Sequence, residues 1–167
     1  PESDSWNTPA LWIERATRAL GGPIDFDPCK AAAHDAVHAV DGCLWPGRNG
    51  LSEAWAGRVW CNPPYSDMGR WWVKIAEEAA ARERVVSLLV LAPLRPSSRW
   101  WRELAAGADW LGVPRSRIPF VSSKTGRAES TGRAELTFFG WRLARPEALQ
   151  VMRLDVCDLS EQVVLFA

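Results

Sequence analysis

The chain has 167 residues, of which 47% are hydrophobic and 24% charged, a composition typical of a folded protein with a packed core. The 20 basic and 20 acidic residues balance, so the chain lacks the overall basic excess that marks many nucleic-acid-binding proteins. The longest apolar run, 85–94, is too short to cross a bilayer and the N-terminus has no signal-peptide pattern, so we expect a cytoplasmic protein without membrane contact.

Helix-like and strand-like patterns alternate along the chain. The continuous apolar run 84–93 is typical of a strand that is buried on both faces. The alternation predicts an α/β fold with βαβ units, a mostly parallel sheet covered by helices on both faces, and one compact domain over 1–167 without a separate target-recognition domain. The predicted helices cover 9–22, 31–40, 67–83, 97–108 and 146–154, and the predicted strands cover 23–28, 57–61, 84–93, 109–114, 117–121 and 134–143.

Tryptophan and arginine are unusually frequent. The chain contains 11 Trp, and its basic residues are 17 Arg and 3 Lys. Trp71–Trp72 and Trp100–Trp101 are adjacent pairs on predicted helices, where neighbouring side chains diverge by about 100°, so a single core stripe cannot bury both members. We therefore expect some indole surface to face a groove, a partner or a ligand. The polar stretch 122–135 predicts a long loop, and loops of this length are often functional.

Two short stretches follow predicted strands, D-F-D-P-C at 25–29 and W-C-N-P-P-Y at 60–65. An open parallel sheet binds its ligands at the carboxyl ends of its strands. In the second stretch, the amide oxygen of Asn62 and the backbone carbonyl of Pro63 are two acceptors in a loop that prolines make rigid. Two convergent acceptors suit an NH2 group, because they can draw its nitrogen out of conjugation with a planar ring and free the lone pair. Tyr65 offers an aromatic face to such a ring.

Four motifs occur in a recognisable order: W-N-T-P at 6–9, I-D-F-D-P-C at 24–29, N-G-L at 49–51 and N-P-P-Y at 62–65. In these the chain resembles the small phage-encoded Dam-type DNA N6-adenine methyltransferases, which are N-P-P-Y amino-methyltransferases. The resemblance covers roughly the first 70 residues and continues weakly through S-R-I-P-F and L-T-F-F-G. It implies a Rossmann-like, three-layer fold that uses S-adenosyl-L-methionine. The implied reaction transfers a methyl group to the N6 amino group of adenine in DNA, in a phage or prophage setting such as restriction-modification.

The resemblance also implies site residues. Of Asp25 and Asp27, we favour Asp27 as the acid that points inward. Asn49 stands where the family usually has Asp, and the usual glycines after Cys29 are missing. The expected residues are Asn62, Pro63, Pro64 and Tyr65 around the target amine; Trp6, Thr8, Pro9, Asp25, Asp27, Pro28, Cys29 and Asn49 around the cofactor, with Asp35 or Asp41 as weak candidates for its ribose; and Ser66, Phe120, Arg127 and Arg133 for the DNA substrate, Phe120 as a second aromatic wall.

A base must leave the double helix before its amino group can react, so the expected partner is DNA with a flipped adenine. With no separate recognition domain, sequence preference must come from the loop around 122–133 and from short insertions. We therefore expect a short or relaxed recognition site. The expected oligomeric state is a monomer or a weak dimer.

Other readings stay open on the sequence alone. The N-P-P-Y motif also fits methylation of RNA adenine, of cytosine N4 or of a protein amide, and Asn-Pro-Pro is also a common turn. A Trp- and Arg-rich module that binds nucleic acid without catalysis is a further alternative. A zinc site is conceivable because two histidines four residues apart share one helix face, although the spacing matches no standard site. Its ligands would be Cys29, His34, His38 and Cys43.

Overall fold

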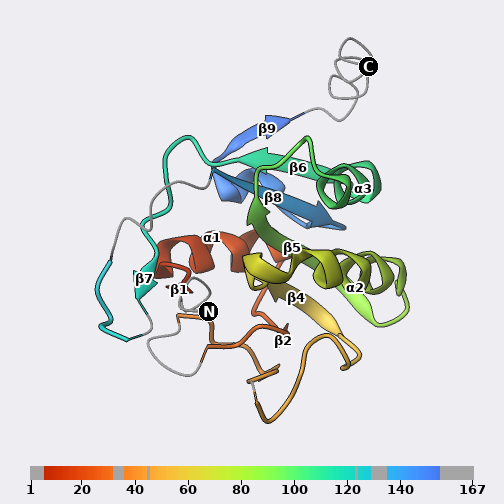
Figure 1. Cartoon of the computed structure of the whole chain (residues 1–167), viewed down its shortest axis with the longest axis horizontal. Coiled ribbons are helices and arrows are strands. Elements are labelled where there is room, and N and C mark those ends of the chain that lie inside the picture. The colour runs from red at the N-terminus through yellow and green to blue at the C-terminus, as the bar shows by residue number, and fades with distance from the viewer. Residues whose placement is uncertain (1–5, 32–35, 45, 123, 129–134, 155–167) are drawn as a thin grey trace.

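The computed structural model describes residues 6–31, 36–44, 46–122, 124–128 and 135–154. Its main feature is a seven-stranded mixed sheet with the strand order β3-β2-β4-β5-β8-β6-β9, together with a two-stranded β1-β7 ribbon (Figure 1). The helices are α1 (Ala10–Leu20), α2 (Met68–Ala80) and α3 (Arg99–Gly107), with short 3-10 helices η2 (Tyr65–Asp67) and η3 (Pro146–Leu149). The strands are β1 (Trp6–Asn7), β2 (Phe26–Asp27), β3 (Asp41–Gly42), β4 (Gly57–Cys61), β5 (Val85–Pro93), β6 (Trp110–Val113), β7 (Val121–Ser122), β8 (Leu136–Trp141) and β9 (Met152–Leu154).

The sheet has a parallel half and an antiparallel half. Strands β3, β2, β4 and β5 pair in parallel, whereas β8 is antiparallel to β5 and to β6, and β9 is antiparallel to β6. The prediction of a mostly parallel sheet is therefore correct only for the half that carries the N-P-P-Y motif. Parallel neighbours need a long crossover, usually a helix, whereas antiparallel neighbours do not. No helix was predicted, and none is found in the described residues, between β6 and β8.

Hydrophobic side chains form a core on each face of the sheet. Along β5, Leu88, Val90 and Ala92 pack with side chains of α2 and α3, and the alternate residues Leu89 and Leu91 pack with α1 and η3. Strand β5 is thus buried on both faces, which confirms the prediction made from its continuous apolar run. Helices cover both faces, α1 on one and α2 with α3 on the other (Figure 1).

Helices α1, α2 and α3 lie close to their expected positions, and the first shows why. Helix α1 ends at Gly21, whose φ of 89° is left-handed and therefore suits glycine. The backbone N–H groups of Gly21 and Gly22 donate to the carbonyls of Arg18 and Thr17, which satisfies two acceptors at the end of the helix.

Among the described residues, no helix combines the length and apolar character that a membrane span requires.

Three sequence predictions are wrong in the described residues. In the predicted helix 31–40, residues 36–40 are not helical, and the N–H of Val40 donates to the carbonyl of Ile24 beside β2. The predicted strand 117–121 is reduced to β7, because Pro119 cannot donate to a ladder. The predicted helix 146–154 becomes η3 followed by β9, since Gln150 adopts a left-handed φ of 55° that ends the helical turn. The short strands β1 and β3 were not predicted.

The chain reverses its direction of progress across the sheet beside β2. From β2 it passes to β3 on one side and then returns to β4 on the other side, and both neighbours are parallel to β2. In open α/β sheets, ligands bind in the crevice outside the carboxyl ends of the strands at such a switch point. The D-F-D-P-C and W-C-N-P-P-Y stretches meet at this place.

Candidate active site

The N-P-P-Y segment is a short, stiff connection between β4 and α2. Strand β4 ends at Cys61, and after three residues the chain enters η2 at Tyr65 and then α2 at Met68. Pro64 has φ −61° and ψ 118°, and its carbonyl accepts a hydrogen bond of 3.1 Å from the N–H of Asp67. The two prolines limit the backbone at the point where β4 ends, so Asn62 is held at the carboxyl edge of the sheet.

Asn62 contains an unusual polar atom. Its Nδ2 donates to Thr8 Oγ1 at 3.3 Å, whereas its Oδ1 is buried and has no hydrogen-bond partner among the described residues. A buried acceptor without a partner destabilises a fold by about 1–3 kcal/mol, so such atoms are rare and call for an explanation. This oxygen is the acceptor that the resemblance assigns to the target amine.

Tyr65 follows Asn62 by three residues and is held largely by apolar contacts. Its ring packs against both hydrophobic cores, and its hydroxyl is buried without a hydrogen-bond partner in the described part of the chain. Burial raises the pKa of the Tyr65 phenol well above its ordinary value, and the nearby thiols of Cys61 and Cys29 add to the shift. The phenol is therefore neutral at physiological pH, and the residue offers mainly its ring.

The β1-β7 ribbon brings two distant parts of the chain to the site. Trp6 pairs with Ser122 and Asn7 with Val121, so Thr8 and Phe120 are placed by the same ribbon although 112 positions separate them in the sequence. Thr8 is 4% exposed and Phe120 6%. Phe120 lies in the same hydrophobic core against which Trp6 and Tyr65 pack. Pro9 follows directly as the residue before α1.

The two acids around β2 have different environments, although residues two apart on a strand share one face, so side-chain alternation alone does not separate them. Asp27 is 3% exposed, and its Oδ1 accepts a hydrogen bond of 2.8 Å from the N–H of Cys29 across Pro28. Asp25 instead accepts from the Arg58 side chain, with Nε at 2.9 Å and NH2 at 3.0 Å, and from the Arg58 backbone N–H at 2.8 Å. Hydrogen bonds from Arg58 lower the pKa of Asp25. Asp27 is therefore buried at the end of β2, whereas Asp25 is held in an ion pair near the start of β4.

Cysteines at the ends of β2 and β4 lie next to each other. The Sγ atoms of Cys29 and Cys61 are 4.0 Å apart, and burial raises the pKa of the Cys29 thiol. Within the described ranges, no three His, Cys, Asp or Glu side chains are arranged to hold a metal ion. Of the residues in the zinc reading, His34 lies outside the described residues. Nothing in the described structure favours that reading.

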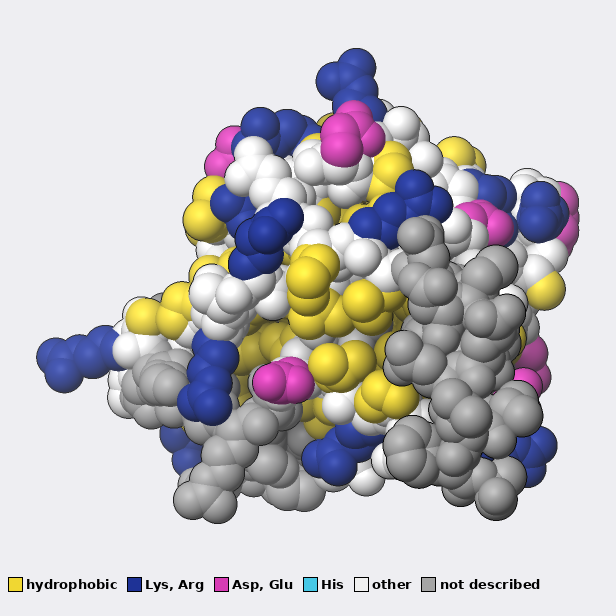
Figure 2. Space-filling view, turned by 90° about the horizontal axis from the view of Figure 1, so that it is seen from above, with side chains coloured by type: hydrophobic (Ala, Val, Ile, Leu, Met, Phe, Trp, Pro, Cys, Tyr) yellow, Lys and Arg dark blue, Asp and Glu magenta, His cyan; other side chains and the backbone are white. Residues whose placement is uncertain are grey.

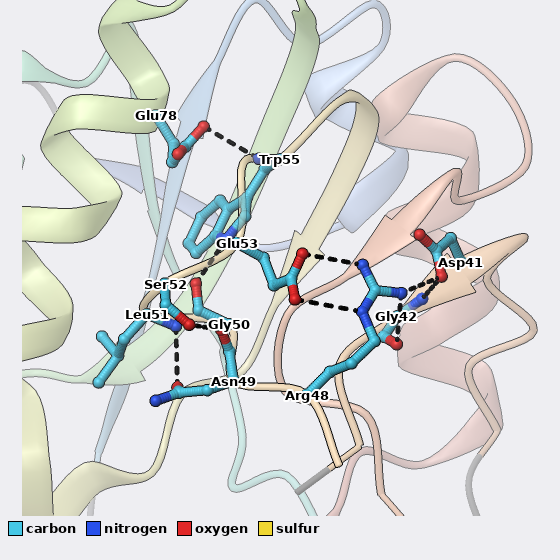
Figure 3. Close-up of polar contacts among 10 residues, drawn as sticks. All are labelled: Asp41, Gly42, Arg48, Asn49, Gly50, Leu51, Ser52, Glu53, Trp55 and Glu78. Carbon is cyan, nitrogen blue, oxygen red and sulfur yellow. Dashed lines mark hydrogen bonds and ion pairs between the residues drawn. The ribbon is translucent and has the colours of Figure 1, made fainter.

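The loop that carries Asn49 packs on the D-P-C turn through Gly50. It is also bonded to α2, where Glu78 accepts from the N–H of Trp55 (Figure 3). Asn49 Oδ1 accepts from the N–H of Leu51 at 3.0 Å, and the Gly50 carbonyl accepts from Trp55 Nε1 at 2.9 Å. A Cβ on Gly50 would lie 2.2 Å from the carbonyl oxygen of Pro28, so only glycine permits this approach. Asn49 thus lies in a loop that packs directly on the turn after β2.

A buried glutamate on α2 holds the far end of that loop, and the sequence analysis missed it. Glu78 is 2% exposed, accepts from the Trp55 N–H at 3.2 Å and pairs with Lys74 Nζ at 2.6 Å and with Arg84. Burial alone raises the pKa of Glu78, but the hydrogen bonds from Arg84 and Lys74 outweigh it and leave the pKa below its ordinary value. The i, i+4 spacing of Lys74 and Glu78 was the one sequence signal for this cluster.

Arg48 was also missed. It joins Asp41 of β3, at 2.6 Å, to Glu53 of the Asn49 loop, at 3.1 Å (Figure 3). The hydrogen bond from Arg48 lowers the pKa of Asp41. Of the two weak candidates for a ribose ligand, Asp41 is therefore engaged by Arg48, and Asp35 lies outside the described residues.

Only some of the residues expected to contact DNA lie in the described part of the chain. Ser66 and Arg127 are exposed, and Arg133 lies outside the described residues. The tryptophan pairs divide as predicted: Trp71 and Trp101 are 5% and 2% exposed, whereas Trp72 and Trp100 are only partly buried. The Arg99 guanidinium of α3 lies over the Trp72 ring of α2, 5.9 Å from its centre, a distance at which cation and ring attract.

A pocket of about 350 Å³ opens elsewhere, between β6, η3 and β9. Figure 2 shows the molecule from above the view of Figure 1; on this face, hydrophobic side chains gather in the middle, with Lys and Arg around them. The pocket contains no residue of the predicted site. Its lining is Trp110, Pro146, Glu147, Val151 and Arg153.

The fold is α/β with a mixed sheet, and the N-P-P-Y motif lies at the carboxyl end of a strand beside the switch point. This arrangement is compatible with a methyltransferase. The family model described as DNA N-6-adenine-methyltransferase (Dam) matches residues 1–161. The chain belongs to this family, whose activity is methylation of the N6 amino group of adenine in DNA. A search of curated proteins gave no match.

Proposed function

We propose that this chain transfers the methyl group of S-adenosyl-L-methionine to a DNA adenine at the switch-point edge of its sheet, with Asn62 as the central residue. The observation that carries the proposal is the buried Asn62 Oδ1, which has no partner among the described residues. The target amine would supply the missing donor. The helices on both faces and the reversal of strand order at β2 support a Rossmann-like, three-layer fold, which we propose as a single domain over 1–167.

The Asn62 Oδ1 and the Pro63 carbonyl would activate the amine by accepting hydrogen bonds from its two N–H groups. Adenine N6 is a poor nucleophile because its lone pair is conjugated with the ring. Acceptors at the Asn62 Oδ1 and the Pro63 carbonyl favour a nitrogen whose lone pair has left the ring plane. One neutral hydrogen bond contributes only about 1 kcal/mol net, so the larger effect is that these rigidly held oxygens stabilise the positive charge that develops on nitrogen during attack.

The residues around the crevice fit the cofactor chemically. When bound, S-adenosyl-L-methionine supplies a methyl group on a positively charged sulfonium. The buried Asp27 carboxylate suits the cofactor's ammonium group, and Thr8 with Pro9 lies beside Asn62, as expected for the methionine end. We assign the cofactor to Trp6, Thr8, Pro9, Asp27, Pro28, Cys29 and Asn49, and we omit Asp25 because Arg58 holds it. Saturable binding of one S-adenosyl-L-methionine per chain in a calorimetric titration is expected, and an absence of binding would contradict the assignment.

Tyr65 should act through its ring, because a base stacks on an aromatic face and stacking needs no hydroxyl. Tyr65→Phe is therefore expected to keep kcat/KM within about two-fold. Tyr65→Ala removes a stacking surface worth about 1–3 kcal/mol per base, so kcat/KM should fall by about 5- to 150-fold. Steady-state methyl transfer to DNA measures both variants. Equal losses in the two variants would show that the hydroxyl takes part.

The target adenine must be flipped out of the duplex, so the protein has to hold the surrounding strand. Exposed Arg127 and the partly exposed Trp72, with Arg99 above its ring, are suitable contacts for phosphate and for unstacked bases. Since the motifs resemble those of phage enzymes, we place the chain in a phage or prophage that modifies DNA inside a bacterial host, with a short recognition site.

Replacing Arg127 and Arg133 together by alanine should weaken DNA binding and leave the affinity for S-adenosyl-L-methionine unchanged. If each arginine neutralises one phosphate, the slope of log K against log salt should decrease by roughly 1.8. Arg82→Ala is the matched control. Arg82 is exposed in the turn before β5, at the amino-terminal end of the strand, whereas the proposed site lies at the carboxyl ends. Fluorescence anisotropy over a salt titration measures the slope, and an unchanged slope would refute the contact.

A further inference from the structure

The contact between Asn62 and Thr8 determines which end of the Asn62 amide is available. An amide has a donor end and an acceptor end, and only the oxygen can accept from the hydrogens of a target amine. In the structure the donor end is engaged, since Nδ2 donates to Thr8 Oγ1 at 3.3 Å, and Oδ1 is left buried and unpartnered among the described residues. With its nitrogen held in this way, the amide presents its oxygen to the site.

Thr8 is itself firmly placed. On its N-terminal side, β1 pairs with β7 through Trp6 and Asn7. On its C-terminal side, the carbonyl of Pro9 accepts from the N–H groups of Trp12 and Ile13 at the start of α1, at 2.9 and 3.2 Å. The Thr8 side chain is 4% exposed, so its hydroxyl lies at a fixed place in a nearly closed environment. These features make Thr8 a suitable acceptor for orienting another side chain.

We propose that Thr8 is a positioning residue for the transfer reaction. Its hydroxyl oxygen accepts from Asn62 Nδ2 and so keeps Asn62 Oδ1 directed at the target amine. Without this acceptor, the amide can rotate and turn its own NH2 toward the amine, where two donors face each other and no activation follows. This inference rests on the proposed role of Asn62, and it gives Thr8 a task distinct from lining the cofactor.

The sharpest comparison is Thr8→Ser against Thr8→Ala, because both lack the γ-methyl group and differ only in the hydroxyl. We expect Thr8→Ser to keep kcat within about three-fold of the parent. At saturating S-adenosyl-L-methionine, Thr8→Ala should lower kcat by about ten-fold, the size expected for one hydrogen bond, while KM for DNA stays within about two-fold. Thr8→Val, which has nearly the shape of threonine, should behave like Thr8→Ala.

Several outcomes would overturn this role. Equal kcat in the serine and alanine variants would show that the hydroxyl does not orient Asn62. A normal kcat at saturation combined with a weakened Kd in Thr8→Ala would assign the hydroxyl to the cofactor alone. The melting temperature and the stoichiometry of S-adenosyl-L-methionine binding give the folded fraction of each variant, and kcat is calculated per folded chain. Full activity of Asn62→Ala is a separate result, which would refute the proposed function and not only the role of Thr8.

Discussion

Asn62→Ala is expected to lower kcat for methyl transfer to DNA by about 100- to 1000-fold, the size seen when one preorganised hydrogen-bonding group is removed from a transition-state site. The reason is that Asn62 Oδ1 is a buried acceptor with no partner among the described residues, at the carboxyl end of β4. The Pro63 carbonyl remains but cannot by itself draw the nitrogen out of conjugation. Single-turnover transfer measures the chemical step directly.

The same substitution should not destabilise the fold. It removes a buried oxygen that has no hydrogen bond in the described structure. The one hydrogen bond lost is that from Asn62 Nδ2 to Thr8 Oγ1, which is 3.3 Å long. We therefore expect a melting temperature equal to or above that of the parent, and an unchanged Kd for S-adenosyl-L-methionine. A variant that loses activity only because it unfolds would contradict this account of Asn62.

Glu78→Ala is expected to lower the free energy of unfolding by about 3–5 kcal/mol, the size typical of breaking a buried ion pair by removing one partner. Glu78 is 2% exposed and accepts from Lys74, Arg84 and the Trp55 N–H, so its loss removes the carboxylate that both cations share and leaves a buried N–H without its acceptor. The neighbouring Glu77→Ala is the control, because Glu77 is exposed and should change stability by less than about 0.5 kcal/mol. Urea denaturation measures both, and similar values for the two would contradict the prediction.

The stabilisation by Glu78 should also depend on pH. The pKa of Glu78 is lower in the folded protein than its ordinary value of 4.5, because hydrogen bonds from Arg84 and Lys74 outweigh the effect of burial. A depressed carboxyl pKa stabilises the fold above the unfolded pKa, and the contribution is lost as the pH falls through the folded pKa. The difference in stability between parent and Glu78→Ala should therefore shrink below about pH 4.5. A difference that stays constant down to pH 3 would contradict this coupling.

Much of the framework could be predicted because its signals are local. The apolar run of β5, the amphipathic pattern of α2 and the glycines that end α1 each lie within one segment, and the structure has these elements where the patterns place them. The N-P-P-Y motif is likewise local, and two prolines after a strand leave little choice but a rigid loop at its end.

The remainder depends on pairing between distant segments. Strands β1 and β7 have two residues each, too few for a recognisable alternation, so the ribbon that brings Thr8 toward Asn62 has no sequence signal of its own. The sequence motif suggests Asp25 as a cofactor ligand, but in the structure Asp25 pairs with Arg58, which lies 33 positions away in the sequence. The predicted helix 31–40 contains five alanines, which favour a helix, yet residues 36–40 are not helical and the N–H of Val40 donates to the carbonyl of Ile24 before β2. Tertiary pairing in this case outweighs local propensity.

Transfer of a labelled methyl group from S-adenosyl-L-methionine to unmethylated plasmid DNA, followed by nucleoside analysis, tests the central claim most directly. The account predicts label in N6-methyladenine with the parent protein and almost none with Asn62→Ala under the same conditions. Label in N4-methylcytosine, label only when RNA replaces DNA, or undiminished label with Asn62→Ala would contradict it.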